Sequence, residues 1–127
     1  MTAMTSALWL MLSLSAPLLG TRWELTELKG AAVEGARPYL SLEAETNRAT
    51  GSGGCNRFSG PFELEEDSLR FGPLAATRMA CAEGMDVEVK LFEALEAVEK
   101  YRIEGETLEL LDAAGETLLR FGARTSP

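Results

Sequence analysis

The chain has 127 residues, 46% of them hydrophobic, which is enough for one domain with a single core. Its formal net charge of −8 argues against nucleic acid, because a phosphate-binding protein needs a basic stripe, and it disfavours an anionic membrane surface. The chain contains no histidine, the commonest general base and metal ligand. A Ser-His or Cys-His catalytic pair is therefore excluded, and a zinc site is nearly excluded.

An apolar run over residues 7–19, broken only by two serines and a proline, is typical of the hydrophobic region of a signal peptide. At about 13 residues it is too short to span a bilayer. No Lys or Arg precedes it, and small residues allow a cut before Ala16. We expect residues 1–19 to be a signal-peptide-like leader, with no stable membrane anchor after its removal and a periplasmic or secreted location. The alternative is that residues 14–19 form the first strand of the domain.

Strand alternation begins at Thr21 and places Trp23 and Leu25 on one face. A second strand is expected at 39–43 and a third at 49–56. The three glycines of the third strand indicate a bulge or a place where another part of the chain comes close. A phosphate-binding loop is the weaker reading, because no helix starts after this segment.

The rest of the chain predicts a hairpin, an irregular segment, a helix and more strands. The hairpin spans residues 62–71 around an acidic turn, and residues 72–81 are apolar but aperiodic. Asp86 is expected to cap a helix over about 87–98. Its apolar stripe comprises Val87, Leu91, Leu95 and Val98, whereas Glu88, Lys90, Glu93, Glu96 and Glu99 are expected to face water. Three further strands follow, and residues 123–127 are expected to be frayed.

Two separated motifs carry a family resemblance. Gly-Gly-Cys-Asn-Arg-Phe-Ser-Gly at 53–60 and Thr-Arg-Met-Ala-Cys at 77–81, in that order, closely resemble the signature of META domains, the family of the heat-shock protein HslJ. The runs at 20–25, 101–105 and 108–112 extend the match, which covers about residues 20–122. The motif residues expected to be structural are Gly53, Gly54, Asn56, Arg57, Phe58, Gly60, Thr77, Arg78 and Met79.

The resemblance and the predicted elements imply one architecture. We expect an α+β fold, in which a strongly bent antiparallel sheet or incomplete β-barrel of about eight strands has one helix packed on it. META domains are also likened to the pilotins of type III secretion, which are small envelope proteins that bind lipids and partners. The resemblance does not imply any catalysed reaction, because the activity of META domains is not established.

Cys55 and Cys81 are the only cysteines, and together with an export-like leader they favour a disulfide. Buried free thiols are the main alternative, and a reactive thiol activated by Arg57 or Arg78 is a weaker one. Arg78, a charge among small and apolar residues, is expected to be held by buried carbonyls or a carboxylate near residues 53–56.

The leading functional hypothesis is a non-enzymatic envelope protein with a stress-related, HslJ-like role and a part in antibiotic tolerance, with no cofactor and no bound metal. It is expected to be a monomer. The alternative is a module that holds a small apolar ligand or a segment of a protein partner in the mouth of the barrel. A third hypothesis is a thiol or carboxylate enzyme.

Overall fold

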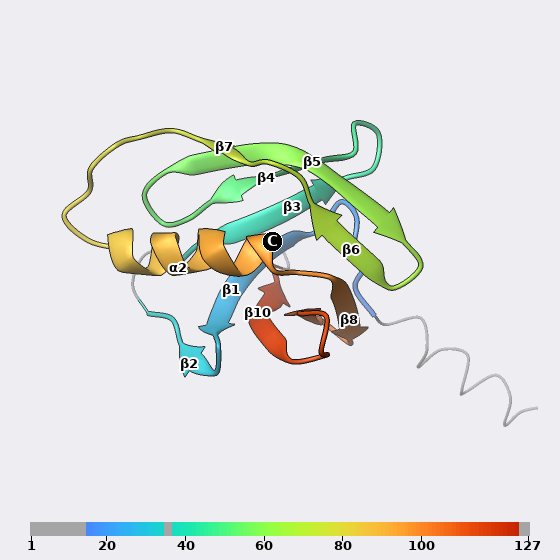
Figure 1. Cartoon of the computed structure of the whole chain (residues 1–127). Coiled ribbons are helices and arrows are strands. Elements are labelled where there is room, and N and C mark those ends of the chain that lie inside the picture. Colours follow the sequence, from blue (N-terminus) through green and yellow to red (C-terminus); the bar gives the residue numbers. More distant parts are fainter. Residues whose placement is uncertain (1–14, 35–36, 125–127) are drawn as a thin grey trace, which may run out of the picture.

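The computed structural model describes residues 15–34 and 37–124 and shows one helix against a large antiparallel sheet (Figure 1). The predicted α+β class is confirmed. The strands are β1 (Arg22–Leu28), β2 (Ala31–Ala32), β3 (Tyr39–Glu43), β4 (Arg48–Ser52), β5 (Arg57–Glu65), β6 (Ser68–Phe71), β7 (Ala75–Ala76), β8 (Lys100–Glu104), β9 (Thr107–Leu111) and β10 (Thr117–Ala123), and the helix is α2 (Met85–Glu96).

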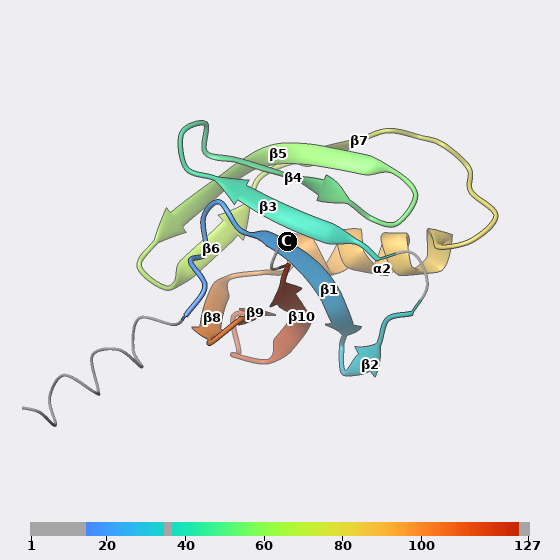
Figure 2. The ribbon, with the colours of Figure 1, turned by 180° about the vertical axis from the view of Figure 1, so that it is seen from behind.

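The sheet bends until its two ends meet. Its strand order is β10-β9-β8-β6-β5-β4-β3-β1-β2, and β1 also pairs with β10, so that eight strands form a ring (Figure 2). The ring is weakest between β6 and β8, where Ser68 and Lys100 are the only paired residues of the ladder. Two further backbone hydrogen bonds support this junction, from Leu69 N to Glu99 O at 3.1 Å and from Tyr101 N to Asp67 O at 3.1 Å. The ring is therefore closed without being a regular barrel.

The core fills the inside of the ring, as strand alternation predicts. Trp23 and Leu25 on β1 are fully buried, and so are Leu40 and Leu42 on β3. The polar residues between them face the outside of the sheet, because side chains alternate between the two faces of a strand. The inner face is thus apolar, and the outer face carries the polar side chains.

The helix covers the inner side of the sheet and buries Leu91, Ala94 and Leu95. It begins at Met85, and Gly84 in a left-handed conformation precedes it, without a side-chain cap. The predicted cap at Asp86 is therefore wrong. The helix ends at Glu96, and Val98 is buried just beyond it.

The predicted third strand is too long. β4 ends at Ser52, and the chain reverses through residues 53–56, where Gly53 N donates a hydrogen bond to Asn56 O at 2.9 Å. β5 then pairs antiparallel with β4. The reversal depends on Gly54, whose φ of 111° is unfavourable for residues with a side chain. The sequence analysis placed Gly53 and Gly54 inside the strand, whereas they form part of the turn that ends it.

The folded region begins before residue 20, the boundary expected from the family resemblance. Ala16 N donates to Gly105 O at 2.9 Å, Leu18 is 7% exposed within the core, and the Trp23 indole donates to Leu18 O at 3.1 Å. At the other end, Arg124 N donates to Arg22 O at 2.9 Å, so Ala123 and Arg124 are held rather than frayed. Residues 1–14 of the expected leader and 125–127 of the expected tail lie outside the described residues.

A truncation series tests this boundary. A chain that begins at Ala16 is expected to fold with full stability, whereas one that begins at Gly20 loses the burial of Leu18, at a cost of about 1.5–3 kcal/mol. Urea unfolding of the two chains measures the difference. Equal free energies of unfolding would show that residues 16–19 only rest on the sheet.

Candidate functional site

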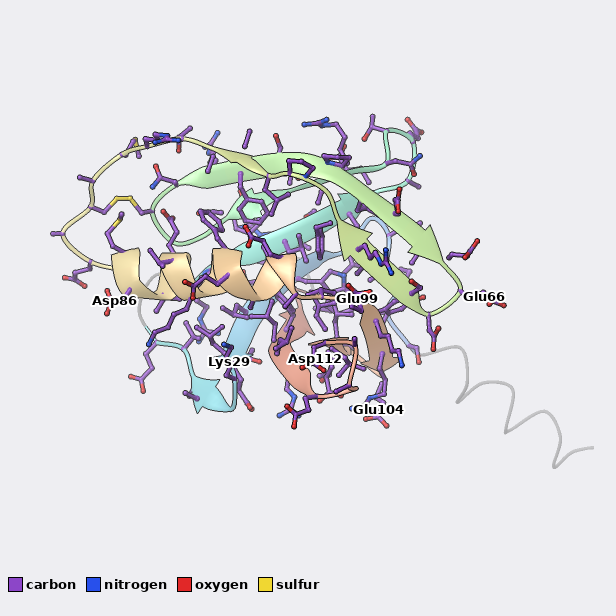
Figure 3. All side chains as sticks on the ribbon, in the orientation of Figure 1. Lys29, Glu66, Asp86, Glu99, Glu104 and Asp112 are labelled. Atoms are coloured by element: carbon purple, nitrogen blue, oxygen red, sulfur yellow. A yellow bond between two sulfur atoms is a disulfide. The ribbon has the colours of Figure 1, made fainter. Side chains whose placement is uncertain are left out.

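The disulfide predicted between Cys55 and Cys81 is present. It joins the turn between β4 and β5 to residues 72–81, which we call the strap because they cross from β6 towards α2 (Figure 3). The Cα atoms of the two cysteines are 6.0 Å apart, a usual separation for a disulfide. The bond fixes the end of the strap close to the glycine-rich turn.

Asn56 is the centre of a hydrogen-bonded cluster beside this disulfide. Its Oδ1 accepts from the Thr77 hydroxyl at 2.8 Å and from Met79 N at 2.6 Å. Its Nδ2 donates to Met79 O at 3.2 Å and to Glu88 Oε2 at 2.7 Å. One side-chain amide thus joins the turn, the strap and the helix. We call Asn56, Thr77, Met79 and Glu88 the Asn56 clamp.

Glu88 is the residue of the clamp that sequence reasoning missed, because it was expected to face water. It is 3% exposed, and its Oε1 accepts from Cys55 N at 3.1 Å and from Asn56 N at 2.6 Å. The signal was available, because positions 88, 91 and 95 have the spacing of one helix face. Backbone N–H groups and an amide satisfy the carboxylate, as a buried charge requires.

Arg78 does not have the role expected of it. It lies on the strap and is exposed, and no hydrogen bond or ion pair joins its side chain to another described residue. The turn at 53–56 does hold a buried charge, but that charge is the carboxylate of Glu88. The backbone N–H groups of the turn are donors, and donors bind an anion rather than a guanidinium.

The remaining motif residues support the clamp in two ways: the glycines leave space for close contacts, and Phe58 and Arg57 make further contacts with α2 and the strap. A Cβ on Gly53 would lie 2.6 Å from Glu88 Cγ, and one on Gly60 would lie 2.5 Å from Pro73 O in the strap. The expectation that glycines mark a close approach is thus confirmed. Phe58 is buried and meets Phe92 of α2 edge-on, with ring centroids 5.5 Å apart. Arg57 is exposed, but its backbone is tied to Thr77 by two hydrogen bonds.

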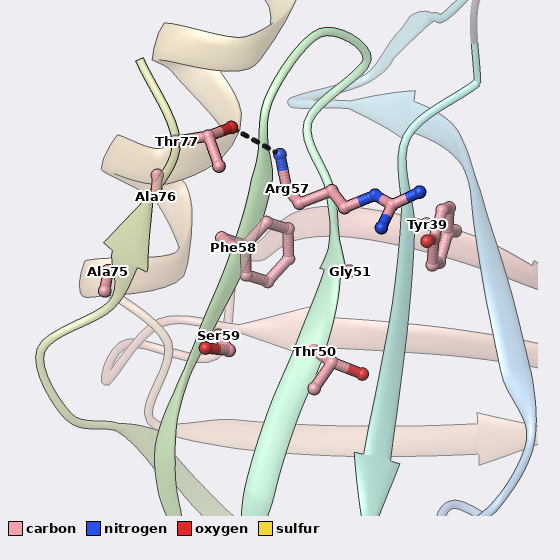
Figure 4. A pocket seen from close by; sticks show the side chains of 9 residues that line it. All are labelled: Tyr39, Thr50, Gly51, Arg57, Phe58, Ser59, Ala75, Ala76 and Thr77. Atoms are coloured by element: carbon pink, nitrogen blue, oxygen red, sulfur yellow. Dashed lines mark hydrogen bonds between the residues drawn. The ribbon is translucent and has the colours of Figure 1, made fainter.

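An open hollow of about 580 Å³ lies on the outer face of β3, β4 and β5, bounded by β7 (Figure 4). Its lining residues are Tyr39, Thr50, Gly51, Arg57, Phe58, Ser59, Ala75, Ala76 and Thr77. The Arg57 side chain extends across the sheet toward Tyr39. From the other side, the Arg22 guanidinium stacks on the Tyr39 ring, 3.6 Å from its centroid. We call the hollow lined by these nine residues the outer hollow.

A second, apolar hollow lies between the strap and α2. Its enclosed part, of about 180 Å³, is lined by Phe71, Gly72, Pro73, Leu74, Ala76, Phe92 and Glu96. A more open part of about 460 Å³ continues past Met79 and Met85. The Met79 side chain is 58% exposed there, which is unusual for a large apolar residue. We call the two parts together the strap hollow.

An ion-pair network centred on the buried carboxylate of Glu109, with partly exposed arginine partners, joins β8, β9, β10 and β1, away from the signature motifs. Glu109 is 8% exposed; its Oε2 accepts from Arg120 Nε at 3.0 Å and its Oε1 from Arg102 Nε at 2.9 Å. Arg120 also pairs with Glu27 at 3.0 Å. The hydrogen bonds from Arg120, and next those from Arg102, hold the pKa of Glu109 below its ordinary value of 4.5.

This network predicts a pH dependence of stability. Because the pKa of Glu109 is lower in the folded chain than in the unfolded chain, its contribution is complete above about pH 4.5 and is lost as the pH falls through the folded pKa. The stability difference between the wild type and Glu109→Gln should therefore be largest at neutral pH and shrink in acid. Urea unfolding over a pH series measures it, with Glu104→Gln, exposed on β8, as control. A difference that stays constant with pH would contradict the assignment.

The described residues thus define a class of protein: a disulfide-linked α+β domain in which one helix packs on a ring-like antiparallel sheet. Comparison with family models identifies the family, because the META domain model matches residues 16–125. The chain belongs to the META domain family. The match begins at Ala16, whose N–H group donates to Gly105 O.

Solved structures support the fold. An NMR structure of a protein from Burkholderia xenovorans is 31% identical, with 86% of this chain and 85% of that chain covered and a TM-score of 0.69. A second NMR structure is 28% identical over 83% of this chain and 90% of that one, with a TM-score of 0.65. A DUF4847 family protein from Bacteroides vulgatus is 12% identical, covers 87% and 96%, and with a TM-score of 0.62 shares the fold alone. No curated protein matches the chain.

Proposed function

We propose that this META domain protein is a non-enzymatic protein of the periplasm or the secreted space, with a stress-related role of the HslJ kind that includes tolerance to antibiotics. One observation carries the non-enzymatic part of the proposal: the signature residues Asn56, Thr77 and Met79 are engaged in a structural clamp. The polar atoms of Asn56 bond to the strap and the helix, and both oxygens of Glu88 are occupied. The family motif thus builds a scaffold in which these polar side-chain atoms are engaged in hydrogen bonds, which supports a structural role for it.

The disulfide supports the proposed location. Cys55 and Cys81 are bonded, and such bonds persist in the periplasm and outside the cell, whereas reducing systems keep cytosolic thiols free. Within the described residues, no helical segment has the length and hydrophobicity needed to cross a membrane. The stress role itself rests on the family resemblance, which is an argument by analogy.

Deletion of the gene in the source cell tests the role. We expect the deletion strain to survive heat shock or antibiotic exposure less well, and the wild-type gene to restore survival. A gene encoding Glu93→Ala, a change on the exposed face of α2, should also restore it. Survival equal to that of the parent strain under both stresses would refute the stress role.

A second candidate function is favoured by the strap hollow, which suits a small apolar ligand or an apolar segment of a partner. Its enclosed part has a mainly apolar lining, as ligand sites generally do. The uncharged apolar fluorophore 1-N-phenylnaphthylamine is a suitable probe. Met79→Ser should weaken its binding, whereas Val89→Ser should not, because Val89 is similarly exposed but does not line the hollow. Equal binding by all three proteins would exclude the hollow as the site.

A further inference from the structure

The outer hollow brings the guanidinium group of Arg57 towards the Tyr39 ring, and a second guanidinium group, that of Arg22, stacks on the same ring from β1 without lining the hollow. Tyr39 and Arg57 lie in one cross-strand row, because Tyr39 pairs with Ser52 on β4 and Ser52 pairs with Arg57 on β5. Their side chains leave the same face of the sheet, so the long Arg57 side chain can extend across Ser52 to Tyr39 (Figure 4). Arg22 stacks on the ring from the neighbouring strand β1. The two guanidinium groups thus approach the tyrosine from different sides.

The charges of these two arginines are unpaired among the residues that the structure describes. Arg70, Arg102, Arg120 and Arg124 each pair with a carboxylate. Neither Arg22 nor Arg57 does, although the chain carries 20 Asp and Glu residues. A guanidinium presents a planar set of donors that matches a carboxylate or a phosphate. The hollow therefore offers the donor set of Arg57 to an external anion, and Arg22 places a second donor set on the neighbouring Tyr39 ring.

The next row of the same face consists of hydroxyl groups. Ser41, Thr50 and Ser59 lie side by side on β3, β4 and β5, because Ser41 pairs with Thr50 and Thr50 pairs with Ser59. All three are half-buried. Arg48 donates to the Ser59 hydroxyl at 3.3 Å, and each hydroxyl can both donate and accept. A floor of hydroxyl groups beside guanidinium groups complements a ligand that carries hydroxyls as well as a negative charge.

We propose that the outer hollow binds an acidic saccharide chain. Arg57 binds its carboxylate or phosphate beside Tyr39, and Arg22 adds positive charge on the β1 side of that ring. The hydroxyl groups of the saccharide lie along the row of Ser41, Thr50 and Ser59. The open shape of the hollow suits a chain lying across the sheet better than a small molecule, which needs an enclosing pocket. Nucleic acid stays disfavoured, because a long phosphate backbone requires more basic residues than this face provides.

Titration calorimetry with four probes tests the proposal: an oligogalacturonate, a phosphorylated oligosaccharide, an uncharged cello-oligosaccharide and a penta-glutamate peptide. At least one acidic saccharide is expected to bind, and the one that binds identifies the anionic group. Arg57→Gln should weaken this binding about tenfold or more, since hydrogen bonds to a charged group are lost. Arg78→Gln removes the same charge from the exposed strap and should leave binding unchanged.

Two further measurements separate the parts of the site. Arg57→Lys keeps the charge but not the planar donor set, so it should restore only part of the affinity. Thr50→Val removes one hydroxyl with little change of shape and should weaken binding of the saccharide. Unchanged melting temperatures would confirm that these variants are folded. The proposal is wrong if neither acidic saccharide binds, if Arg57→Gln and Arg78→Gln behave alike, or if the uncharged saccharide or penta-glutamate binds as tightly.

Discussion

Replacement of Glu88 by alanine is expected to lower the free energy of unfolding by about 3–5 kcal/mol. The carboxylate accepts hydrogen bonds from Cys55 N, Asn56 N and Asn56 Nδ2, and it is 3% exposed. Its removal leaves the N–H groups of Cys55 and Asn56 with no partner and leaves Asn56 Nδ2 with Met79 O alone, in a place that water hardly reaches. An unsatisfied buried donor costs about 1–3 kcal/mol, so the losses reach a large part of the stability of a small domain.

Chemical denaturation of three variants measures this effect. Glu88→Gln keeps an acceptor for the two backbone N–H groups but places its own amide against that of Asn56, so we expect about half the loss. Glu93→Ala, on the exposed face of the same helix, and Arg78→Met should each change stability by at most about 0.5 kcal/mol. If Glu88→Ala lowered the free energy of unfolding no more than Glu93→Ala does, the hydrogen bonds of the clamp would not contribute to stability.

Much of the ring could be predicted from the sequence, because strand alternation and turn residues are local signals. Trp23 and Leu25 are buried as their spacing requires, and the hairpin from Phe62 to Phe71 closes at the acidic turn. β2 and β7 were missed, because each has only two residues, too few to show alternation. β2 pairs with β1 and β7 pairs with β5. Closure of the ring was also beyond sequence reasoning. It depends on pairing between β1 and β10, which are far apart in the chain.

The clamp was predicted in part. The cysteine pair and the glycines marked the right segments, and Thr77 and Met79 lie in contact with Asn56 as the shared motif suggested. The expected charge was the wrong one. A lone arginine among apolar residues suggested a buried cation, but a turn that directs its N–H groups inward binds an anion, and Glu88 supplies it. Only the direction of backbone donors distinguishes these cases, and it is not visible in a sequence.

The outer hollow was not predicted at all. Its residues come from four strands, and their alignment follows from register, which places Tyr39 opposite Ser52 and Ser52 opposite Arg57. A change of one residue in that register would turn these side chains to the inner face. Arg22, Tyr39 and the hydroxyl residues are unremarkable in the sequence, where polar residues are expected at every outward position. The net negative charge also hid a local group of arginines.

Reduction of the disulfide between Cys55 and Cys81 is expected to lower the melting temperature by about 10 °C or more. The bond closes a loop between residues 26 positions apart in the chain. In the chain-entropy description, such a loop removes conformations from the unfolded state and stabilises the fold by about 3 kcal/mol. The clamp makes the effect local as well, since Asn56 follows Cys55 directly and holds the strap that ends at Cys81.

Calorimetry of the oxidised and reduced protein measures the shift, and the double variant Cys55→Ser, Cys81→Ser serves as a permanently open form. Hydrogen exchange shows which part of the fold loses structure when the disulfide is reduced. The amides of Cys55, Asn56 and Met79 should lose protection on reduction more than those of β9 and β10, because the bond joins the turn to the strap and not to the far side of the ring. Peptide mapping of protein isolated without reductant should recover the two cysteines as one crosslinked pair. Two free thiols in that protein, or melting unaffected by reductant, would mean that the Asn56 clamp alone holds the strap in the cell.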